Sequence, residues 1–314
     1  MAPAEATIMS IEPVAPSQSV NVIARLSSWA EARFHVLAVL PTALIMLLIF
    51  GGPLLFSLYL SFQGWTKSRS LYGGGFVGFE NYQMLFTEPA FLASMVLTII
   101  YTVGAVAVEM VLGMAIASLL NKDVPLMRIV RSLLIMPMMM TPIVAALCWK
   151  LLLDPQYGLV NYLLGHQIVW LGDTNLAPIA VAIVNIWQNT PYVAVLLLAG
   201  LRSLPGDPRE AAQIDGATRW QIFWYVTLPA LRPAILVALL LRTIFEFRSF
   251  DNVYVMTGGG PAGSTELLSV YTYSLTFGQF DFTLGAAASW IMLITSICLC
   301  AVPILLFRVL EGRR

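Results

Sequence analysis

Residues 36–62 read VLAVLPTALIMLLIFGGPLLFSLYLSF, a run of 27 positions without a charged side chain. A helix needs about 20 apolar residues to cross the hydrocarbon core of a bilayer. Two further runs, 176–201 and 282–307, are uncharged over 26 positions each. The sequence therefore predicts at least three transmembrane helices.

Three more runs predict spans although charged residues interrupt them. Residues 91–121 contain only Glu109, and residues 132–153 contain only Lys150. Residues 233–256 contain four charged side chains, which are Arg242, Glu246, Arg248 and Asp251. The predicted fold is an all-α membrane protein with six transmembrane helices, and prolines inside the first and third spans predict kinks.

The composition excludes two broad classes of protein. Charged residues make up 11% of the 314 positions, against about 25% in soluble domains, and the mean hydropathy is +0.81. So few charges cannot cover the surface of a water-soluble protein, which excludes that class. The 17 basic and 17 acidic residues give a net charge of zero, so the clustered basic excess that nucleic-acid binding requires is absent. The three cysteines lie in apolar runs and are interpreted as small buried residues: Cys148, Cys298 and Cys300.

The distribution of Lys and Arg predicts the orientation. With six spans, twelve of these residues fall on the side of the N-terminus and four on the other side, while Arg242 lies inside a span. Because cytoplasmic loops are enriched in Lys and Arg, both termini are predicted to be cytoplasmic. Residues 1–33 are then a cytoplasmic tail, residues 34–314 form the transmembrane domain, and the loop at 202–232 is cytoplasmic.

That loop begins with the signals of a short helix. Asp207 is expected to cap the helix, with Pro208 in the first turn and Glu210 as the capping-box partner. Gly216 is expected to end the helix in a left-handed conformation.

A second helix is expected directly after the glycine. Thr218 and Gln221 repeat the capping-box spacing, and Pro229 is expected to stop this helix before the fifth span. The spacing predicts a helix–turn–helix. It does not distinguish a functional element from a helical hairpin that only links two spans.

The same loop resembles the EAA motif of permease subunits of bacterial ABC importers. The matching residues are Glu210-Ala211-Ala212, Asp215-Gly216-Ala217, Phe223, Leu228-Pro229, Leu231 and Pro233. Three segments elsewhere are similar to the carbohydrate branch, the maltose- and trehalose-type permeases. The first is Phe76-Val77-Gly78 with Asn81, Tyr82, Leu85 and Phe86, and the second is residues 149–161. The third is Phe250-Asp251 with Tyr254, residues 257–261 and Thr265. One departure is Leu97-Thr98, where the family usually has Asn-Thr.

The resemblance implies a non-catalytic subunit in the bacterial inner membrane. Its loop would act as a coupling helix on a separate ATPase, through Glu210, Ala211, Ala212, Asp215, Gly216 and Ala217. No cofactor is expected in this chain, because ATP and Mg would be bound by the ATPase, and the sequence has no G-x-x-x-x-G-K-S/T phosphate loop. The implied partners are a second permease, an ATPase dimer, an extracytoplasmic solute-binding protein, membrane lipid and a carbohydrate substrate.

Polar residues at helical spacing predict a path through the membrane. At about 1.5 Å per residue, Asn185 in the fourth span and Arg242 in the fifth lie about 14 Å inside a core of roughly 30 Å. Asn185, Gln188, Asn189 and Tyr192 share one helix face, and Arg242, Glu246, Ser249 and Phe250 are expected to share another. The predicted substrate path consists of Asn185, Trp187, Gln188, Asn189, Tyr192, Arg242, Phe245, Glu246, Phe250 and Asp251.

Two structural alternatives remain for these residues. In the first, Arg242 and Glu246, which are four positions apart, simply pair with each other and hold helices together. In the second, the amide side chains only form hydrogen bonds between helices. Glu109 belongs either to the path or to the packing between helices.

Two other functions are weaker readings of the sequence. An ion-gradient-driven secondary transporter would use Glu109, Arg242 and Glu246 as a proton relay, but the loop at 202–232 favours the ABC importer. A membrane enzyme would need a nucleophile and a base at suggestive spacing, and none is seen. No metal site is predicted, since the methionines at 136 and 138–140 are typical gap-filling residues and His35 and His166 have no neighbouring ligands.

Overall fold

The computed structural model describes residues 34–64, 75–121 and 127–311. The predicted tail at 1–33 therefore lies outside the described residues. Apart from an isolated antiparallel bridge between Gln63 and Phe76, the described residues form helices, turns and loops. The predicted all-helical fold is confirmed.

The chain divides into two compact units, residues 1–57 and 58–314. The first contains α2 (Phe34–Met46), the wide-turn helix η1 (Leu47–Gly51) and the start of α3 (Gly52–Ser61). Pro53 has no N–H to donate to the preceding turn, which accounts for the local widening to a π-helix at η1. Residues 38–61 form one continuous apolar span of 24 residues.

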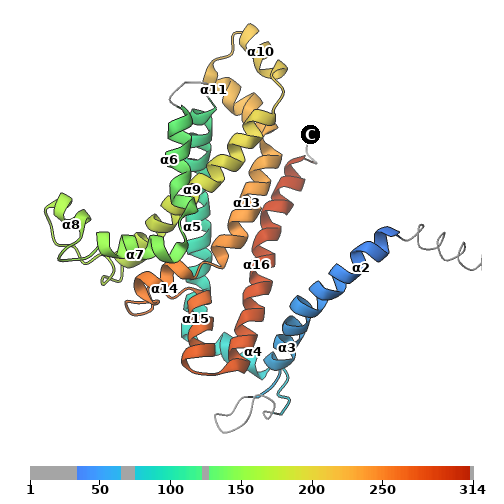
Figure 1. Cartoon of the computed structure of the whole chain (residues 1–314), viewed down its shortest axis with the longest axis vertical. Helices are drawn as coiled ribbons and strands as arrows, with labels where there is room; N and C mark the ends of the chain where they lie inside the picture. The colour runs from blue at the N-terminus through green and yellow to red at the C-terminus, as the bar shows by residue number, and fades with distance from the viewer. Residues whose placement is uncertain (1–33, 65–74, 122–126, 312–314) are drawn as a thin grey trace, which may run out of the picture. The chain divides into compact units, whose positions relative to one another are not determined.

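The second unit is built from the remaining helices (Figure 1). They are α4 (Glu80–Thr87), α5 (Pro89–Leu120), α6 (Met127–Met139), α7 (Pro142–Leu152), α8 (Leu159–Leu164), α9 (Leu176–Ser203), α10 (Asp207–Ile214), α11 (Arg219–Ile222), η2 (Phe223–Thr227), α12 (Leu228–Ala230), α13 (Arg232–Phe247), α14 (Asp251–Thr257), α15 (Leu268–Tyr273), η3 (Ser274–Gly278) and α16 (Phe282–Glu311). Among the described residues four helices are long and apolar enough to cross a membrane, or six when each of two bent pairs counts as one span.

The α5–α9 pair forms the centre of the second unit, and small residues let the two helices approach closely. A Cβ atom on Gly113 of α5 would lie 2.6 Å from Val193 Cγ1 and 3.2 Å from the backbone N of Ala194, both on α9. Ala117 and Leu197 continue the same buried contact. The two helices therefore position polar groups at fixed places along their common face.

The third span is sharply broken. The axes of α6 and α7 differ by 96°, because Pro142 begins α7 and has no N–H with which to continue α6. The carbonyl of Met140 in the break accepts a hydrogen bond from Gln188 Nε2 at 3.0 Å. A side chain of α9 thus satisfies a backbone group that the break sets free.

The loop after α9 contains the predicted glycine turn. Gly216 has φ +79°, and the N–H groups of Gly216 and Ala217 donate to the carbonyls of Gln213 and Ala212 at the end of α10. This is a Schellman ending, as glycine allows. The Thr218–Gln221 capping box is also confirmed.

Two expectations for this loop are wrong. Asp207 is the first residue of α10 and Gly206 is its N-cap, without a side-chain cap, so no capping box forms with Glu210. Pro229 does not stop the second helix, because it lies in the first turn of α12, where a missing N–H is tolerated, and the chain turns at Leu231 instead.

Gly113→Ala should lower the stability of the protein by about 1–3 kcal/mol, since Val193 is β-branched and cannot move away from the new methyl group. The measurement is the thermal unfolding temperature of the purified protein in detergent. Gly104→Ala is the matched control on α5, since no atom lies within 4 Å of a Cβ there. Equal unfolding temperatures for the two variants would contradict the close α5–α9 contact.

Candidate functional site

A cavity of about 370 Å³ opens between α9 and α13, next to the break between α6 and α7. Its lining consists of Met138, Pro142, Asn185, Gln188, Asn189, Tyr192, Arg242, Phe245, Glu246, Arg248, Ser249, Phe250, Asp251 and Asn252. Nine of the ten residues predicted for the path are among them. The exception is Trp187, whose ring packs edge-on against Trp149 with 5.4 Å between centroids.

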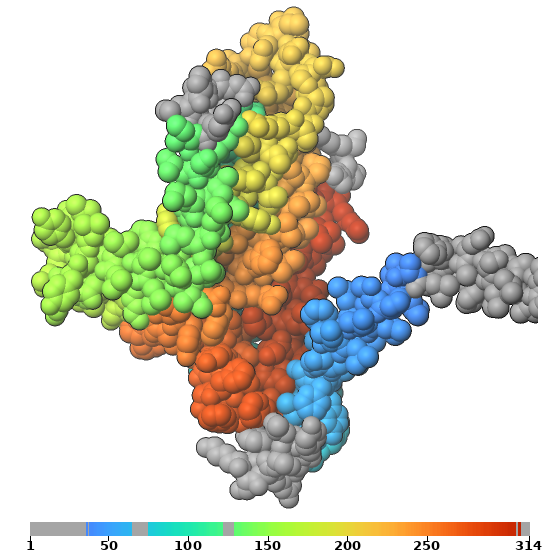
Figure 2. Space-filling view, viewed as in Figure 1, coloured from blue at the N-terminus to red at the C-terminus, as the bar shows by residue number. Residues whose placement is uncertain are grey.

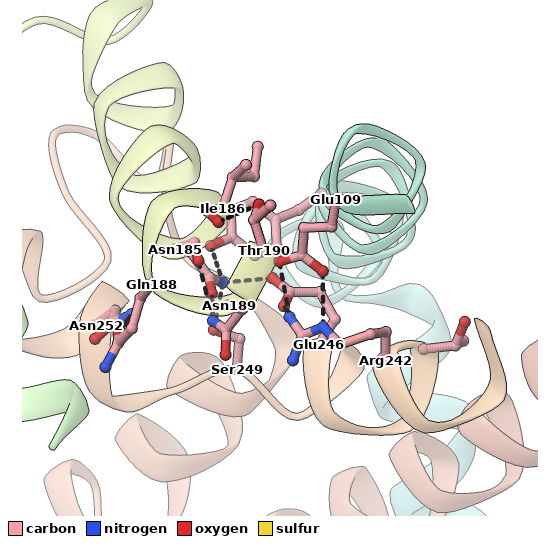
Figure 3. Close-up of polar contacts among 12 residues, drawn as sticks. Glu109, Asn185, Ile186, Gln188, Asn189, Thr190, Arg242, Glu246, Ser249 and Asn252 are labelled. Atoms are coloured by element: carbon pink, nitrogen blue, oxygen red, sulfur yellow. Dashed lines mark hydrogen bonds and ion pairs between the residues drawn. The ribbon is translucent and has the colours of Figure 1, made fainter. Parts of the chain in front are cut away.

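A buried group of three charges joins α5 to α13 (Figure 3). Arg242 donates from Nε to Glu109 Oε2 at 2.7 Å and from Nη2 to Glu109 Oε1 at 2.8 Å. The same Nη2 donates to Glu246 Oε2 at 2.5 Å. The exposed fractions of Glu109, Glu246 and Arg242 are 0%, 2% and 3%, so this charge triad is enclosed by protein.

The alternative that Arg242 and Glu246 pair with each other alone is wrong. Arg242 makes a two-bond contact with Glu109, which lies 133 residues earlier in the chain. The sequence signal was Glu109 itself, as the single charged residue of its span. Its partner does not follow from helical periodicity, because the contact joins two helices that are distant in the sequence.

Asn185 connects α9 to the charge triad. Its Nδ2 donates to Glu246 Oε1 and to the hydroxyl of Tyr101 at 2.7 Å. Its Oδ1 accepts a hydrogen bond from Asn189 Nδ2 on the next turn of the helix. The charge triad and Asn185 thus link α5, α9 and α13.

Gln188 has a different structural task. Its Nε2 donates to the Met140 carbonyl, and its Oε1 accepts from Asn252 Nδ2 at 3.0 Å. The side chain therefore joins α9 both to the break after α6 and to α14.

The expected common face of Arg242, Glu246, Ser249 and Phe250 is wrong in its second half. α13 ends at Phe247 with Arg248 as its C-cap, so Ser249 and Phe250 belong to the turn that leads to α14. This turn directs the chain along the cavity. It brings Arg248 and Asp251, both exposed, to the rim.

The side chains that line the cavity are of two kinds, those bonded to other protein groups and those accessible from the cavity. Asn185, Gln188, Arg242 and Glu246 are buried and use their polar atoms on other protein groups. The accessible side chains are Asn189, Tyr192, Phe245, Arg248, Phe250 and Asp251. They present an amide, two opposite charges and three aromatic rings to the cavity.

The predicted coupling residues lie at one end of the second unit (Figure 1). Glu210, Ala211, Asp215 and Gly216 are exposed, and Ala212 and Ala217 are half-buried. A groove of about 420 Å³ runs beside the glycine turn, lined in part by Ala212, Gly216 and Tyr225. The surface around Gly216 is therefore accessible to another protein.

The segment at 149–161 contains the end of α7, a loop at 153–158 and the start of α8. The backbone N–H groups of Tyr157 and Gln156 donate to Asp154 Oδ1, which holds the pKa of this carboxyl below its ordinary value. Asn161 connects this region to the segment that follows α8. Its Nδ2 donates to the Ile168 carbonyl, and its Oδ1 accepts a hydrogen bond from Trp170 Nε1 at 2.8 Å. These polar groups are used within the loop.

Comparison with known proteins identifies close relatives. Residues 109–314 match the family described as "Binding-protein-dependent transport system inner membrane component". A probable ABC transporter permease protein of Sinorhizobium fredii is 40% identical over 87% of this chain and 89% of its own length. A trehalose/maltose transport system permease protein of Thermococcus litoralis is 33% identical over 86% of this chain and 91% of its own length.

The fold is similar to that of a chain in the crystal structure of a bacterial ABC transporter involved in import of the acidic polysaccharide alginate. The TM-score is 0.78 at 21% identity, with 90% of this chain and 98% of the other chain covered. At this identity the likeness concerns the fold alone.

Arg242→Met should destabilise the protein by about 3–5 kcal/mol, because it leaves two carboxylates buried without their cation. Adding Glu109→Gln and Glu246→Gln should restore most of the stability, since no buried charge then remains. The measurement is thermal unfolding of the purified protein in detergent. Arg248→Met, at the exposed rim, is the control, and an equal effect of the two arginine variants would contradict the structural role of the charge triad.

Proposed function

Because the chain belongs to the binding-protein-dependent transport system inner membrane component family, we propose that it is the permease subunit of an ABC importer whose cargo is a carbohydrate. The observation that carries the proposal is the cavity beside α9 and α13. Its volume falls within the range of about 300–1,000 Å³ that is usual for ligand sites.

The accessible groups of the cavity suit a sugar. Asn189 and Asp251 offer hydrogen-bond partners to hydroxyl groups, and Arg248 adds a donor. Tyr192, Phe245 and Phe250 offer apolar rings for the C–H faces of a pyranose. Relatives that carry trehalose and maltose in their names support this class of cargo.

The energy is proposed to come from a separate ATPase dimer that contacts α10 and the glycine turn. A second permease of the same family and an extracytoplasmic binding protein would complete the importer. One solved relative includes a bound periplasmic protein carrying an alginate pentasaccharide. In the proposed orientation both termini and the 202–232 loop are cytoplasmic, as the distribution of Lys and Arg favours.

The connectivity supports a mechanism of coupling. The proposed coupling loop joins α9 directly to α13, and these helices carry the two sides of the cavity. The charge triad and Asn185 connect both helices to α5. A displacement of α10 would therefore move α5, α9 and α13 together relative to the second permease, and so change access to the cavity, in the manner of a rigid-body transition.

The rival proposal is a secondary transporter. Its proton relay would use Glu109, Arg242 and Glu246, which the structure joins by ion pairs that can equally serve packing. Membership of the family associates the chain with binding-protein-dependent transport.

The test is uptake by the complete importer in sealed vesicles. With binding protein outside and ATP on the ATPase side, uptake of radiolabelled trehalose, maltose or an alginate oligosaccharide should require ATP and persist when ionophores remove ion gradients. Uptake that stops with ionophores would support the secondary transporter. ATP-driven uptake of a non-sugar ligand, identified on the co-purified binding protein, would contradict the proposed carbohydrate cargo but not the proposed ABC importer.

Two variants of Gly216 add a test of the coupling loop in the same vesicles. Gly216→Val should abolish uptake, because a left-handed conformation costs an ordinary residue about 1–2 kcal/mol and a β-branched residue more. Gly216→Asn should transport nearly normally, since Asn tolerates this conformation and no atom lies within 4 Å of a Cβ there. Equal transport by both variants would show that the turn does not couple the two subunits.

A further inference from the structure

We propose that the helical segment after Gly216, residues 219–230, lies in the headgroup layer of the bilayer and fixes the coupling loop to the membrane surface. Its lipid contact is an aromatic face, defined here as Trp220, Phe223 and Trp224. This inference goes beyond the proposed function, because it concerns a lipid contact and does not depend on the cargo.

The two halves of the loop differ in chemistry. Residues 207–215 contain three acidic side chains and no aromatic residue. Residues 219–232 contain no acidic side chain. They begin and end with an arginine, and four of the six residues at 220–225 are aromatic. The first half suits water or a protein surface, and the second half suits an interface that is apolar on one side and anionic on the other.

The rings of the aromatic face contact one another, and its two tryptophans are exposed while Phe223 is half-buried. Trp220 and Trp224 are 69% and 46% exposed. Their ring centroids lie 5.6 Å apart, and Phe223 lies 5.5 Å from Trp224 and 6.0 Å from Trp220. The opposite side of the segment is buried through Ile222 and Thr227. The segment therefore has one side on the bundle, with Phe223 at its edge beside Ile222 and Thr227, and two tryptophans that the described residues leave exposed.

The direction of the segment fits the plane of a membrane. Residues 219–230 and residues 232–257 form helical stretches that are bent by 67° from one another. Since α13 begins the predicted fifth span, a bend of this size directs the segment before it away from the membrane normal and toward the bilayer plane. The bend falls at Leu231, directly before the apolar run that begins at Pro233, so the segment lies where hydrocarbon meets headgroups.

The residue types identify lipid as the occupant. Trp combines a large apolar ring with an N–H donor, and it is enriched at the level of the headgroups for that reason. Arg219 and Arg232 carry positive charge at both ends of the face, which attracts the anionic lipids of a cytoplasmic leaflet. A helix with one apolar face and flanking basic residues is typical of segments that lie on a membrane.

The contact has a mechanical consequence for the loop. Figure 2 shows the loop residues in gold at the end of the second unit, beyond the ends of the long helices. A loop held only by its two ends can be lifted as a whole when α10 is pushed. A segment held in the headgroup layer resists lifting, so that displacement of α10 is converted into a tilt of α13 together with α5 and α9.

The test uses the full importer complex in vesicles of phosphatidylethanolamine and phosphatidylglycerol. Lipids carrying bromine near the top of the acyl chain quench indoles in the interface, and lipids with bromine near the chain end quench indoles deep in the core. The emission of Trp220 and Trp224 is obtained by subtracting that of the variant Trp220→Phe/Trp224→Phe. The matched control is Ile214→Trp in that variant, which places an indole on exposed α10 of the same loop.

Upper-chain bromine should lower the emission of Trp220 and Trp224 at least about twofold, and chain-end bromine should lower it much less. The indole introduced at position 214 should be quenched by neither lipid. Two results would overturn the proposal. One is quenching of Trp220 and Trp224 by aqueous iodide but by neither lipid. The other is protection from lipid and iodide that disappears when the ATPase is removed, which would make the face a protein-docking surface.

Discussion

The guanidinium group of Arg242 between two carboxylates is the interaction on which the arrangement of the bundle depends. A charge far inside a membrane domain is costly unless it is paired and hydrogen-bonded. Glu109 supplies two bonds from α5, and Glu246 supplies a third from the next turn of α13. Asn185 adds α9 through Glu246. Three helices from distant parts of the sequence are thereby held in one register.

This arrangement explains why the cavity has both rigid and adaptable parts. The buried polar groups on one side have their hydrogen bonds satisfied by protein, and breaking any of them leaves an unpaired group in a low-dielectric setting. The rim is formed where α13 ends and the chain turns toward α14, and there the aromatic and charged side chains remain accessible. A cargo can therefore be recognised at the rim without disturbing the bonds that hold the helices.

The parts of this fold that follow from local chemistry are predictable from sequence. The shared face of Asn185, Gln188 and Asn189 follows from helical periodicity, and the left-handed Gly216 follows from the absence of a Cβ atom. The missed features depend on contacts between distant segments or on competing local choices. Glu109 lies 133 residues from Arg242, Trp187 points to Trp149 and not to the cavity, and Asp207 enters the helix because Gly206 takes the cap.

The central claim is that the charge triad makes α5, α9 and α13 move as one unit during transport. It is tested most directly by the distance between spin labels at Val111 on α5 and Val237 on α13, both exposed positions. The distance should be measured in the assembled importer, without nucleotide and with trapped ATP. The account predicts the same narrow distribution in both states, and a broadened one in Arg242→Met. A distance that changes between the two states of the unmodified triad would contradict it.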